Sequence, residues 1–258
     1  MASKRPSPIR PNCPRSRRGS NFGPGSCRRP DLLISNMVIE VIRASFVAMS
    51  HPEMQSTIRA EQQQRLEEIV RADPDLMQLL LVLRDLKPPQ WRIVAGCLYQ
   101  TVWNVLTGRP PRTGIKDYDV IYFEPDVSWS AENHVIVTVA RALPGNFPGN
   151  VEVRNQARVH LWFEERFGTA YSPLTTADES LKRYASVVHA VGVRLEQDGR
   201  LDVLAPFGLD DVFSMTIRPN RVLSNRASHH AKAARAKAIW PEVTVIPWPE
   251  SADPARTV

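Results

Sequence analysis

The sequence predicts an α+β domain with an α/β-like core, in which a small mixed β-sheet is flanked by helices. Three observations favour this class. Helical periodicity alternates with short β-branched runs between residues 61 and 168, the order expected where helices cover a sheet. A hairpin signal follows at residues 191–208. A hydrophobic content of 43% with a charged content of 23% is ordinary for a globular domain.

The first predicted elements are two helices within residues 61–86. Apolar residues recur at helical spacing on both sides of an Asp73-Pro74 break. Asp73 suits an N-cap, and Pro74 suits the first position of the following helix. Residues 38–49 also show helical periodicity, so we expect residues 37–90 to form a group of N-terminal helices.

The segment from residue 91 to 168 alternates strand and helix patterns. Gly108 and Gly168 are placed to end helices, and Ser130 is placed to begin one. The predicted strands are residues 91–96, 115–123 and 151–155, and the predicted helices are residues 97–108, 130–143 and 156–168.

The C-terminal part mixes helices with a hairpin. Alternating residues surround Asp198-Gly199, a pair typical of a two-residue hairpin turn. Asp210 is an N-cap candidate for a helical turn. Further helices are predicted at residues 175–190 and 228–243, and residues 91–250 together form the second predicted domain.

The net charge of +6 is concentrated near the N-terminus. Of 33 basic residues, eight lie in residues 1–30, which hold no acidic residue; the remaining 25 face 27 acidic residues, a net charge of −2. Global charge therefore gives little support to a nucleic-acid-binding domain. Residues 1–36 are rich in Pro, Ser, Gly and Arg, so we expect a disordered basic tail, and a disordered end at 251–258. Alternative interpretations of the tail are a transit peptide and a true start at Met37 or Met49.

The positions of the cysteines and the hydropathy of the chain bear on its cellular compartment. Cys13 and Cys27 lie in the tail and Cys97 stands alone, which argues against a disulfide framework and a Cys-based zinc site. No apolar run approaches the ~20 residues that span a bilayer, so no membrane partner is expected. The tail also lacks the apolar segment of a secretory signal. Together these features predict a cytoplasmic protein.

The chemistry-bearing stretch is "KDYDVIYF", residues 116–123. Because side chains alternate along a strand, Asp117 and Asp119 should project from one face, and Glu152 should project from a neighbouring strand. Three converging carboxylates are unfavourable unless a cation neutralises them. Hard oxygen ligands suit Mg²⁺ or Mn²⁺, so the sequence predicts that these three residues hold a metal ion. Glu124 and Asp126 follow the strand and are weaker candidates for the third ligand.

The other half of the predicted site is the Gly96-Cys97 pair, which ends one strand and begins a helix. Backbone amides at a helix N-terminus, with no side chain blocking the approach, bind phosphate oxygens. Lys116 and Arg154 are candidates for contacting phosphate as a point charge and a fork. We therefore expect a triphosphate at the helix start, next to the metal on the carboxylates.

These stretches resemble a known family. "VAGCLYQTVWN", "GIKDYDVIYF", "VEVRNQARVHLWFEERFG" and "LDVLAPFGLDDVFSMTIRPN" are similar to the small, mostly uncharacterised bacterial nucleotidyltransferase-like proteins of the polymerase beta-type superfamily. The resemblance covers roughly residues 65–250, and Gly96, Asp117 and Asp119 match its motif. It implies the polymerase beta-type nucleotidyltransferase fold. It also implies metal-dependent transfer of a nucleoside monophosphate from a nucleoside triphosphate to a hydroxyl, with Glu152 as third ligand or base.

Two rival functions come from other classes. Cys97 stands where the superfamily has Ser or Gly, Tyr118 separates the aspartates, and the gap after Gly96 is long. These departures favour a catalytically degenerate fold that binds a nucleotide or a partner. An RNA-binding module that uses the basic tail is the second rival. The acceptor of the transfer reaction is left open between a small molecule, a protein side chain and an RNA end.

Several other side chains have a structural interpretation beside a functional one. Cys97 is expected to be a small buried hydrophobe. His160 is expected in a structural hydrogen bond, with a place in the cleft as the alternative, and Asn155 is a further candidate for lining the cleft. The basic residues of the last helix are expected to form a solvated face, with a grip on triphosphate or RNA as the alternative; they are Lys232, Arg235 and Lys237.

Overall fold

The computed structural model describes residues 51–250, and side chains from residue 54 onward. The predictions for the basic tail, for residues 38–49 and for the end at 251–258 lie outside the described residues. The described residues belong to one compact unit. Within the described residues no helix is both long and apolar enough to cross a membrane.

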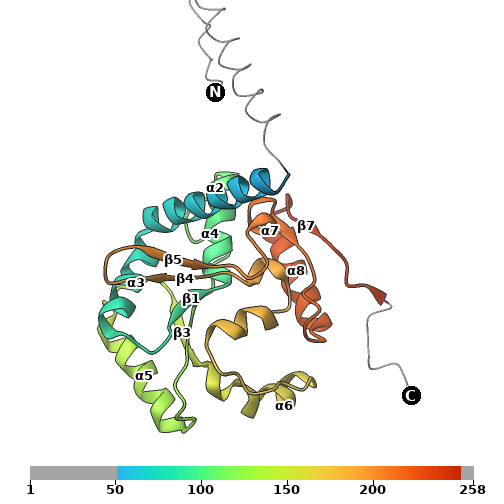
Figure 1. The fold of residues 1–258 in the computed structure, drawn as a ribbon. Coiled ribbons are helices and arrows are strands. Elements are labelled where there is room, and N and C mark those ends of the chain that lie inside the picture. Colours follow the sequence, from blue (N-terminus) through green and yellow to red (C-terminus); the bar gives the residue numbers. More distant parts are fainter. Residues whose placement is uncertain (1–50, 251–258) are drawn as a thin grey trace, which may run out of the picture. The chain divides into compact units, whose positions relative to one another are not determined.

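A five-stranded mixed sheet forms the centre of this unit, and the predicted fold class is confirmed (Figure 1). The strand order is β3-β2-β1-β4-β5; β2 and β3 run parallel, and the other neighbouring pairs are antiparallel. The strands are β1 (Arg92–Val94), β2 (Asp117–Tyr122), β3 (Asn150–Asn155), β4 (Gly192–Leu195) and β5 (Leu201–Leu204). A separate pair of short parallel strands joins β6 (Thr216–Ile217) to β7 (Thr244–Val245).

Longer helices pack around the sheet and its ends (Figure 1). α2 packs on α4 and β5, and α3 packs on β4 and α5. The main core lies between these helices and the sheet, and Leu66, Ile69 and Val70 of α2 join four leucines of α3 in it. The helices are α2 (His51–Ala72), α3 (Pro74–Leu86), α4 (Gly96–Thr107), α5 (Trp129–Ala142), α6 (Phe163–Phe167), α7 (Asp210–Phe213) and α8 (Arg226–Ile239).

The helix ends follow local chemistry. Asp73 accepts hydrogen bonds from the amides of Asp75 and Leu76, both at 3.0 Å, and Pro74 begins α3, as predicted. Gly108 ends α4 in the left-handed conformation (φ 62°), which glycine adopts at little cost. The hairpin of β4 and β5 turns at Gly199, also with positive φ.

Two of the predicted helices are wrong. Residues 156–168 form a 3₁₀ turn, η1 (Gln156–Leu161), followed by the short α6, because the backbone at Trp162 leaves the helical region (φ −133°). Residues 175–190 form η2 (Asp178–Arg183) and η3 (Val187–His189). An extended Ser186, bridged to Pro219, separates these two turns.

Two predicted caps are also wrong. Ser128, not Ser130, caps α5: its hydroxyl accepts a hydrogen bond from the amide of Ala131. Asp210 is the first residue of α7 and makes no capping bond; Leu209 occupies the cap position. Both errors displace a helix start by one or two residues, the usual uncertainty of a cap inferred from residue type alone.

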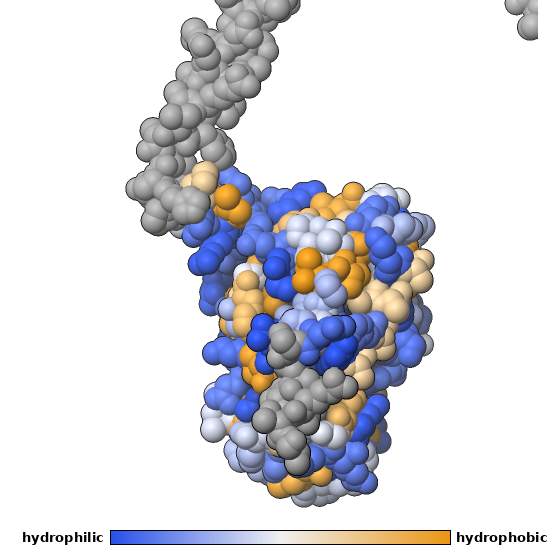
Figure 2. Space-filling view, turned by 90° about the vertical axis from the view of Figure 1, so that its right-hand side faces the viewer, coloured by the Kyte–Doolittle hydropathy of each residue, from blue (hydrophilic) through white to orange (hydrophobic). Residues whose placement is uncertain are grey.

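The two faces of β2 are chemically different. Tyr118, Val120 and Tyr122 are buried on the side of the helices, whereas Asp117 and Asp119 are half-buried on the other side. In the parallel pairing with β3, Asp119 lies opposite Glu152. Elsewhere on the surface, hydrophilic and hydrophobic residues are interspersed over the face drawn in Figure 2.

Candidate active site

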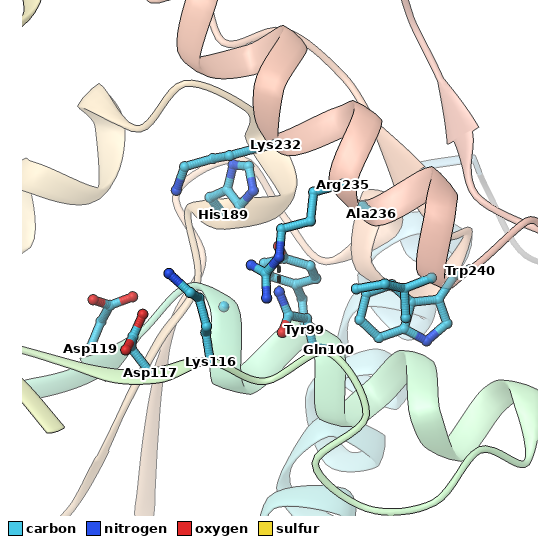
Figure 3. A pocket seen from close by; sticks show the side chains of 12 residues that line it. Tyr99, Gln100, Lys116, Asp117, Asp119, His189, Lys232, Arg235, Ala236 and Trp240 are labelled. Atoms are coloured by element: carbon cyan, nitrogen blue, oxygen red, sulfur yellow. Dashed lines mark hydrogen bonds between the residues drawn. The ribbon is translucent and has the colours of Figure 1, made fainter. Parts of the chain in front are cut away.

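A cavity lies where β2 begins and α4 starts, beneath α8 (Figure 3). Its walls come from segments far apart in the sequence, and most of its polar side chains are cationic or carboxylate groups. We call it the cationic cavity. It is lined by Gly96, Tyr99, Gln100, Lys116, Asp117, Asp119, His189, Lys232, Arg235, Ala236, Ile239 and Trp240.

The two aspartates of β2 enter this cavity side by side (Figure 3). Asp117 accepts a hydrogen bond from the side-chain amide of Asn150, 3.2 Å away on β3. Burial raises the pKa of Asp119 to about 6, and the neighbouring charges of Glu152 and Asp117 add to the rise, while Lys232 opposes it. The negative charges of Glu152 and Asp117 therefore act on Asp119 at this end of β2, in addition to its burial.

The start of α4 forms the opposite wall. Gly96 lines the cavity, and a Cβ added there would meet no atom closer than 3.7 Å. Glycine is therefore not required by packing, and it leaves the helix end open. The first amides of an α-helix have no partner within the helix, so the amides at Gly96 and Cys97 are placed for an anion.

The side chain of Cys97 is not part of this wall. Its side chain is fully buried, does not line the cavity, and its thiol contacts the carbonyl oxygen of Val94 at 3.6 Å. Burial raises the thiol pKa far above its ordinary value, so the thiol stays protonated and unreactive. This agrees with its expected structural role.

Cationic side chains cross the cavity from α8. Lys232 extends from α8 toward the aspartates, and Arg235 extends toward Gln100 (Figure 3). Desolvation lowers the pKa of Lys232, and Asp119 counteracts this effect; its side chain nevertheless keeps contact with solvent. Arg235 donates to the carbonyl oxygen of Gly114 at 2.7 Å, which fixes its direction. Lys116, a predicted phosphate contact, also lines this cavity.

His189 is a site residue that the sequence patterns did not indicate. It is 2% exposed and lines the cavity, and neither ring nitrogen has a hydrogen-bond partner among the described residues. Its ring packs edge-on against Tyr99, with centroids 5.2 Å apart. Burial lowers its pKa well below the ordinary value, so His189 is neutral and keeps one N–H to donate. In the sequence it is a single histidine near the end of a predicted helix, and no motif around it indicates that it lines a cavity.

Glu152 and Arg154 lie beside Asp119 but line a second cavity. They follow one another on the same face of β3, and an Arg154 nitrogen lies 3.4 Å from a Glu152 oxygen. Within residues 51–250, no three His, Cys, Asp or Glu side chains lie close enough together to hold a metal ion. The register therefore brings Glu152 next to Asp119, while its side chain engages an arginine.

The remaining candidates lie apart from both cavities. Asn155 is buried and bonds the loop that follows β2, donating to the carbonyl oxygen of Glu124 at 2.8 Å. His160 and Lys237 do not line either cavity. Lys237 donates to the carbonyl oxygens of Pro241 and Val243, which anchors the chain after α8.

Comparisons with known proteins identify the family and the fold. The model of a family described as nucleotidyltransferase matches residues 82–245, and no curated protein matches the chain. A solved structure described as an NMR structure that reveals a CCA-adding enzyme head domain has 22% identity and a TM-score of 0.58. The match covers 72% of this chain and 96% of that chain, and it shows a shared fold.

Two further solved structures are more distant. A CCA-adding enzyme in complex with CTP has 13% identity and a TM-score of 0.46, over 70% of this chain and 43% of that chain. The Thermotoga maritima CCA-adding enzyme complexed with tRNA has 14% identity and a TM-score of 0.45, over 70% and 42%. The chain thus spans less than half the length of these two. Because the family model covers well over half of the sequence, from α3 to β7, the chain belongs to this nucleotidyltransferase family.

Proposed function

We propose that this protein transfers a nucleoside monophosphate from a nucleoside triphosphate to a hydroxyl acceptor, in a metal-dependent reaction. The observation that carries the proposal is the cationic cavity itself. It places two β2 carboxylates against the open start of α4, beneath the cations of α8. A triphosphate needs donors for its oxygens and a counter-charge for its anions, and this cavity offers both.

The donor set suits a hard divalent cation. Asp117 and Asp119 share one face of β2, with Glu152 beside them on β3. Burial is the main cause of the raised pKa of Asp119, and the charges of Glu152 and Asp117 add to it. Mg²⁺ or Mn²⁺ would be held by these carboxylates, with Glu152 joining after release from Arg154. When bound, the ion polarises the phosphoryl oxygens and offsets their negative charge.

The chain's own groups have separate tasks. The amides at Gly96 and Cys97 donate to phosphate oxygens, and Lys116 and Lys232 offset charge on the pyrophosphate end. His189 donates its remaining N–H toward the same end. Arg154 is the predicted phosphate contact on the far side of the carboxylates. Glu152 is either the third metal ligand or the base that accepts the proton of the attacking hydroxyl.

The 3.4 Å contact between Glu152 and Arg154 favours a second candidate function. In a catalytically degenerate protein this contact would persist, and the third carboxylate would not take part in metal binding. The cationic cavity would then bind a nucleotide or a partner without transferring it. Donor binding without product formation is the result that this alternative predicts.

The test is a transfer screen with α-³²P-labelled ATP, CTP, GTP and UTP, using cell extract as the source of acceptors. We expect a labelled product in the presence of Mg²⁺ or Mn²⁺. The Asp117→Asn/Asp119→Asn double variant should lose at least ~10²-fold of this activity, as expected when charge stabilisation at the reacting phosphate is removed. Asp85→Asn, an exposed acid near the end of α3 that lines neither this cavity nor the one beside Glu152, is the matched control and should keep full activity. No labelled product with any triphosphate or metal would contradict the proposal.

A further inference from the structure

A second cavity shares Asp119 and Lys232 with the cationic cavity and lies on the Glu152 side of them. Aromatic rings and arginines dominate its walls, and we call it the aromatic cavity. It is formed where β3, η1, α6 and η2 meet. Its lining includes Glu152, Arg154, Trp162, Phe163, Arg166, Phe167, Tyr171, Arg183 and Tyr184.

The rings of this cavity form a connected cluster. Phe163 packs against Phe167 and Tyr171 with centroid distances of 4.7 and 4.5 Å, and Trp162 lies 6.4 Å from Phe167. Phe167 remains 44% exposed, and Trp162 and Phe163 are only partly buried. The cluster therefore leaves ring surface free against which a further planar group could stack.

Arginines border these rings. The Arg183 guanidinium lies 4.4 Å from the Tyr171 ring centroid, and that of Arg166 lies 5.4 Å from the Phe167 centroid. Arg166 and Arg154 are exposed. A planar guanidinium both stacks on rings and donates two parallel hydrogen bonds to phosphate. The cavity therefore combines surfaces for a planar ring with donors for an anion.

In-line displacement determines which substrate occupies which cavity. The attacking and leaving oxygens lie on opposite sides of the phosphorus. Given the proposed function, the leaving pyrophosphate occupies the cationic cavity, next to Lys116 and the start of α4. The attacking hydroxyl must then approach Asp119 from the other side, which is the aromatic cavity.

We propose that the aromatic cavity is the acceptor subsite and that the acceptor is a nucleotide unit, either free or at the 3′ end of a single strand. Its base stacks on the Phe163 and Phe167 rings, and its phosphate contacts Arg166 and Arg154. Base–aromatic stacking tolerates any base because every base has a π-face. This inference rests on the proposed function.

The chemical step balances within the two substrates. The acceptor hydroxyl oxygen forms a bond to the α-phosphorus, and the bond from that phosphorus to the oxygen bridging to the β-phosphate breaks. Pyrophosphate leaves with the bonding electron pair. The hydroxyl proton passes to the Glu152 carboxylate, which lines the acceptor side of the site, and then to solvent.

The test measures two affinities on the same full-length proteins. Fluorescence anisotropy reports binding of a 5′-labelled six-nucleotide single-stranded RNA, with AMP as competitor, and calorimetry reports binding of ATP with Mg²⁺. For Phe167→Ala/Arg166→Ala we expect a 10- to 100-fold loss of RNA affinity and less than a twofold change in ATP affinity. Both side chains are exposed, so the double variant should fold.

Phe207→Ala/Arg200→Ala is the matched control, since both residues are exposed and lie outside the cavity; it should leave both affinities unchanged.

Displacement of the RNA by AMP identifies a free nucleotide as a ligand of this subsite, and its absence identifies a strand end. ATP binding without any RNA or AMP binding overturns the inference and leaves the proposed function intact. An equal loss of RNA affinity in the control pair also overturns it. Absence of ATP binding overturns the proposed function itself.

Discussion

The two faces of β2 do different work, although alternate residues of one strand build them. On the helix side, Tyr118, Val120 and Tyr122 are almost fully buried. On the other side, Asp117 and Asp119 meet cations and solvent. Apolar burial on one face supplies stability, while the opposite face holds like charges that oppose it. Stability and the proposed function therefore rest on different residues of the same strand.

The apolar core on the helix side of the sheet should give the largest loss of stability. Leu83 on α3 is fully buried in the core, whereas Leu81 on the same helix is 39% exposed. Leu83→Ala should lower the free energy of unfolding by about 2–5 kcal/mol, because it removes buried methyl groups and leaves a cavity. Leu81→Ala is the matched control and should cost less than about 1 kcal/mol. Urea unfolding measures both values.

The transfer activity of the folded protein should not follow that loss of stability. The folded fraction of Leu83→Ala should keep its transfer activity, because the residue lies outside both cavities. A large drop in activity per folded molecule, measured well below the unfolding transition, would contradict the separation of the two faces.

The next largest effect is a loss of triphosphate affinity on the side of β2 that carries Asp117 and Asp119. Lys232→Met removes an ammonium group that lies between the aspartates and α8 (Figure 3). We expect a loss of triphosphate affinity of about 10- to 100-fold, since hydrogen bonds to charged groups contribute about 1.5–3 kcal/mol. Calorimetric titration with ATP and Mg²⁺ measures this loss. Lys182→Met, at an exposed position outside both cavities, is the control; an equal loss there would rule out a local contact.

A smaller effect is the pH dependence of stability that Asp119 causes. Its pKa rises from an ordinary 3.8 to about 6 in the folded protein, so the folded state binds the proton more tightly than the unfolded state does. The stabilisation from this proton is complete below pH 3.8 and is lost as the pH rises through about 6. Metal-free Asp119→Asn should therefore be more stable than the natural protein at pH 7.5.

The size of that gain is bounded by the shift. Two pKa units correspond to at most about 3 kcal/mol; because Asp119 keeps solvent contact, we expect about 1 kcal/mol, or a melting temperature about 2–4 °C higher. Thermal unfolding in EDTA should show the gain at pH 7.5 and its decrease toward pH 4. A variant that is less stable at pH 7.5 would contradict the expected electrostatic cost at this site.

The smallest effect concerns the cap of α3. Asp73→Ala removes the acceptor for two amide donors and should cost about 1 kcal/mol. Burial raises the pKa of Asp73, so Asp73→Asn, which keeps the acceptor without the buried charge, should retain the stability of the natural protein. Chemical unfolding of the two variants separates the cap from the charge. Equal losses would show that the charge itself stabilises this helix start.

Local patterns were sufficient for much of the sheet and its turns. Alternation predicted β2 with both aspartates on one face, and Gly108 and Asp73-Pro74 predicted helix ends that the structure contains. Patterns failed where tertiary contacts override periodicity. Residues 175–190 have a helical pattern, but the bridge from Ser186 to Pro219 pulls the chain into an extended conformation.

The site was predicted only where its residues are close in sequence. The Gly96 bend and the carboxylates of β2 give local signals, and the structure brings them to one cavity. His189 comes from a distant segment and gave no signal. Lys232 was expected on a solvated helix face, with a grip on triphosphate as the alternative, and its neighbours do not indicate that the fold returns it to β2. The Glu152–Arg154 contact is also invisible to pattern reasoning, because it depends on side-chain conformations rather than on strand register.

The central claim is that the β2 carboxylates bind a divalent ion together with a triphosphate. Calorimetry of the natural protein with ATP, with Mg²⁺ and then with EDTA, tests it most directly, with Asp117→Asn/Asp119→Asn alongside. We predict binding that needs Mg²⁺ and disappears in the double variant. Binding of equal strength in EDTA, or binding that survives the double substitution, would contradict the claim.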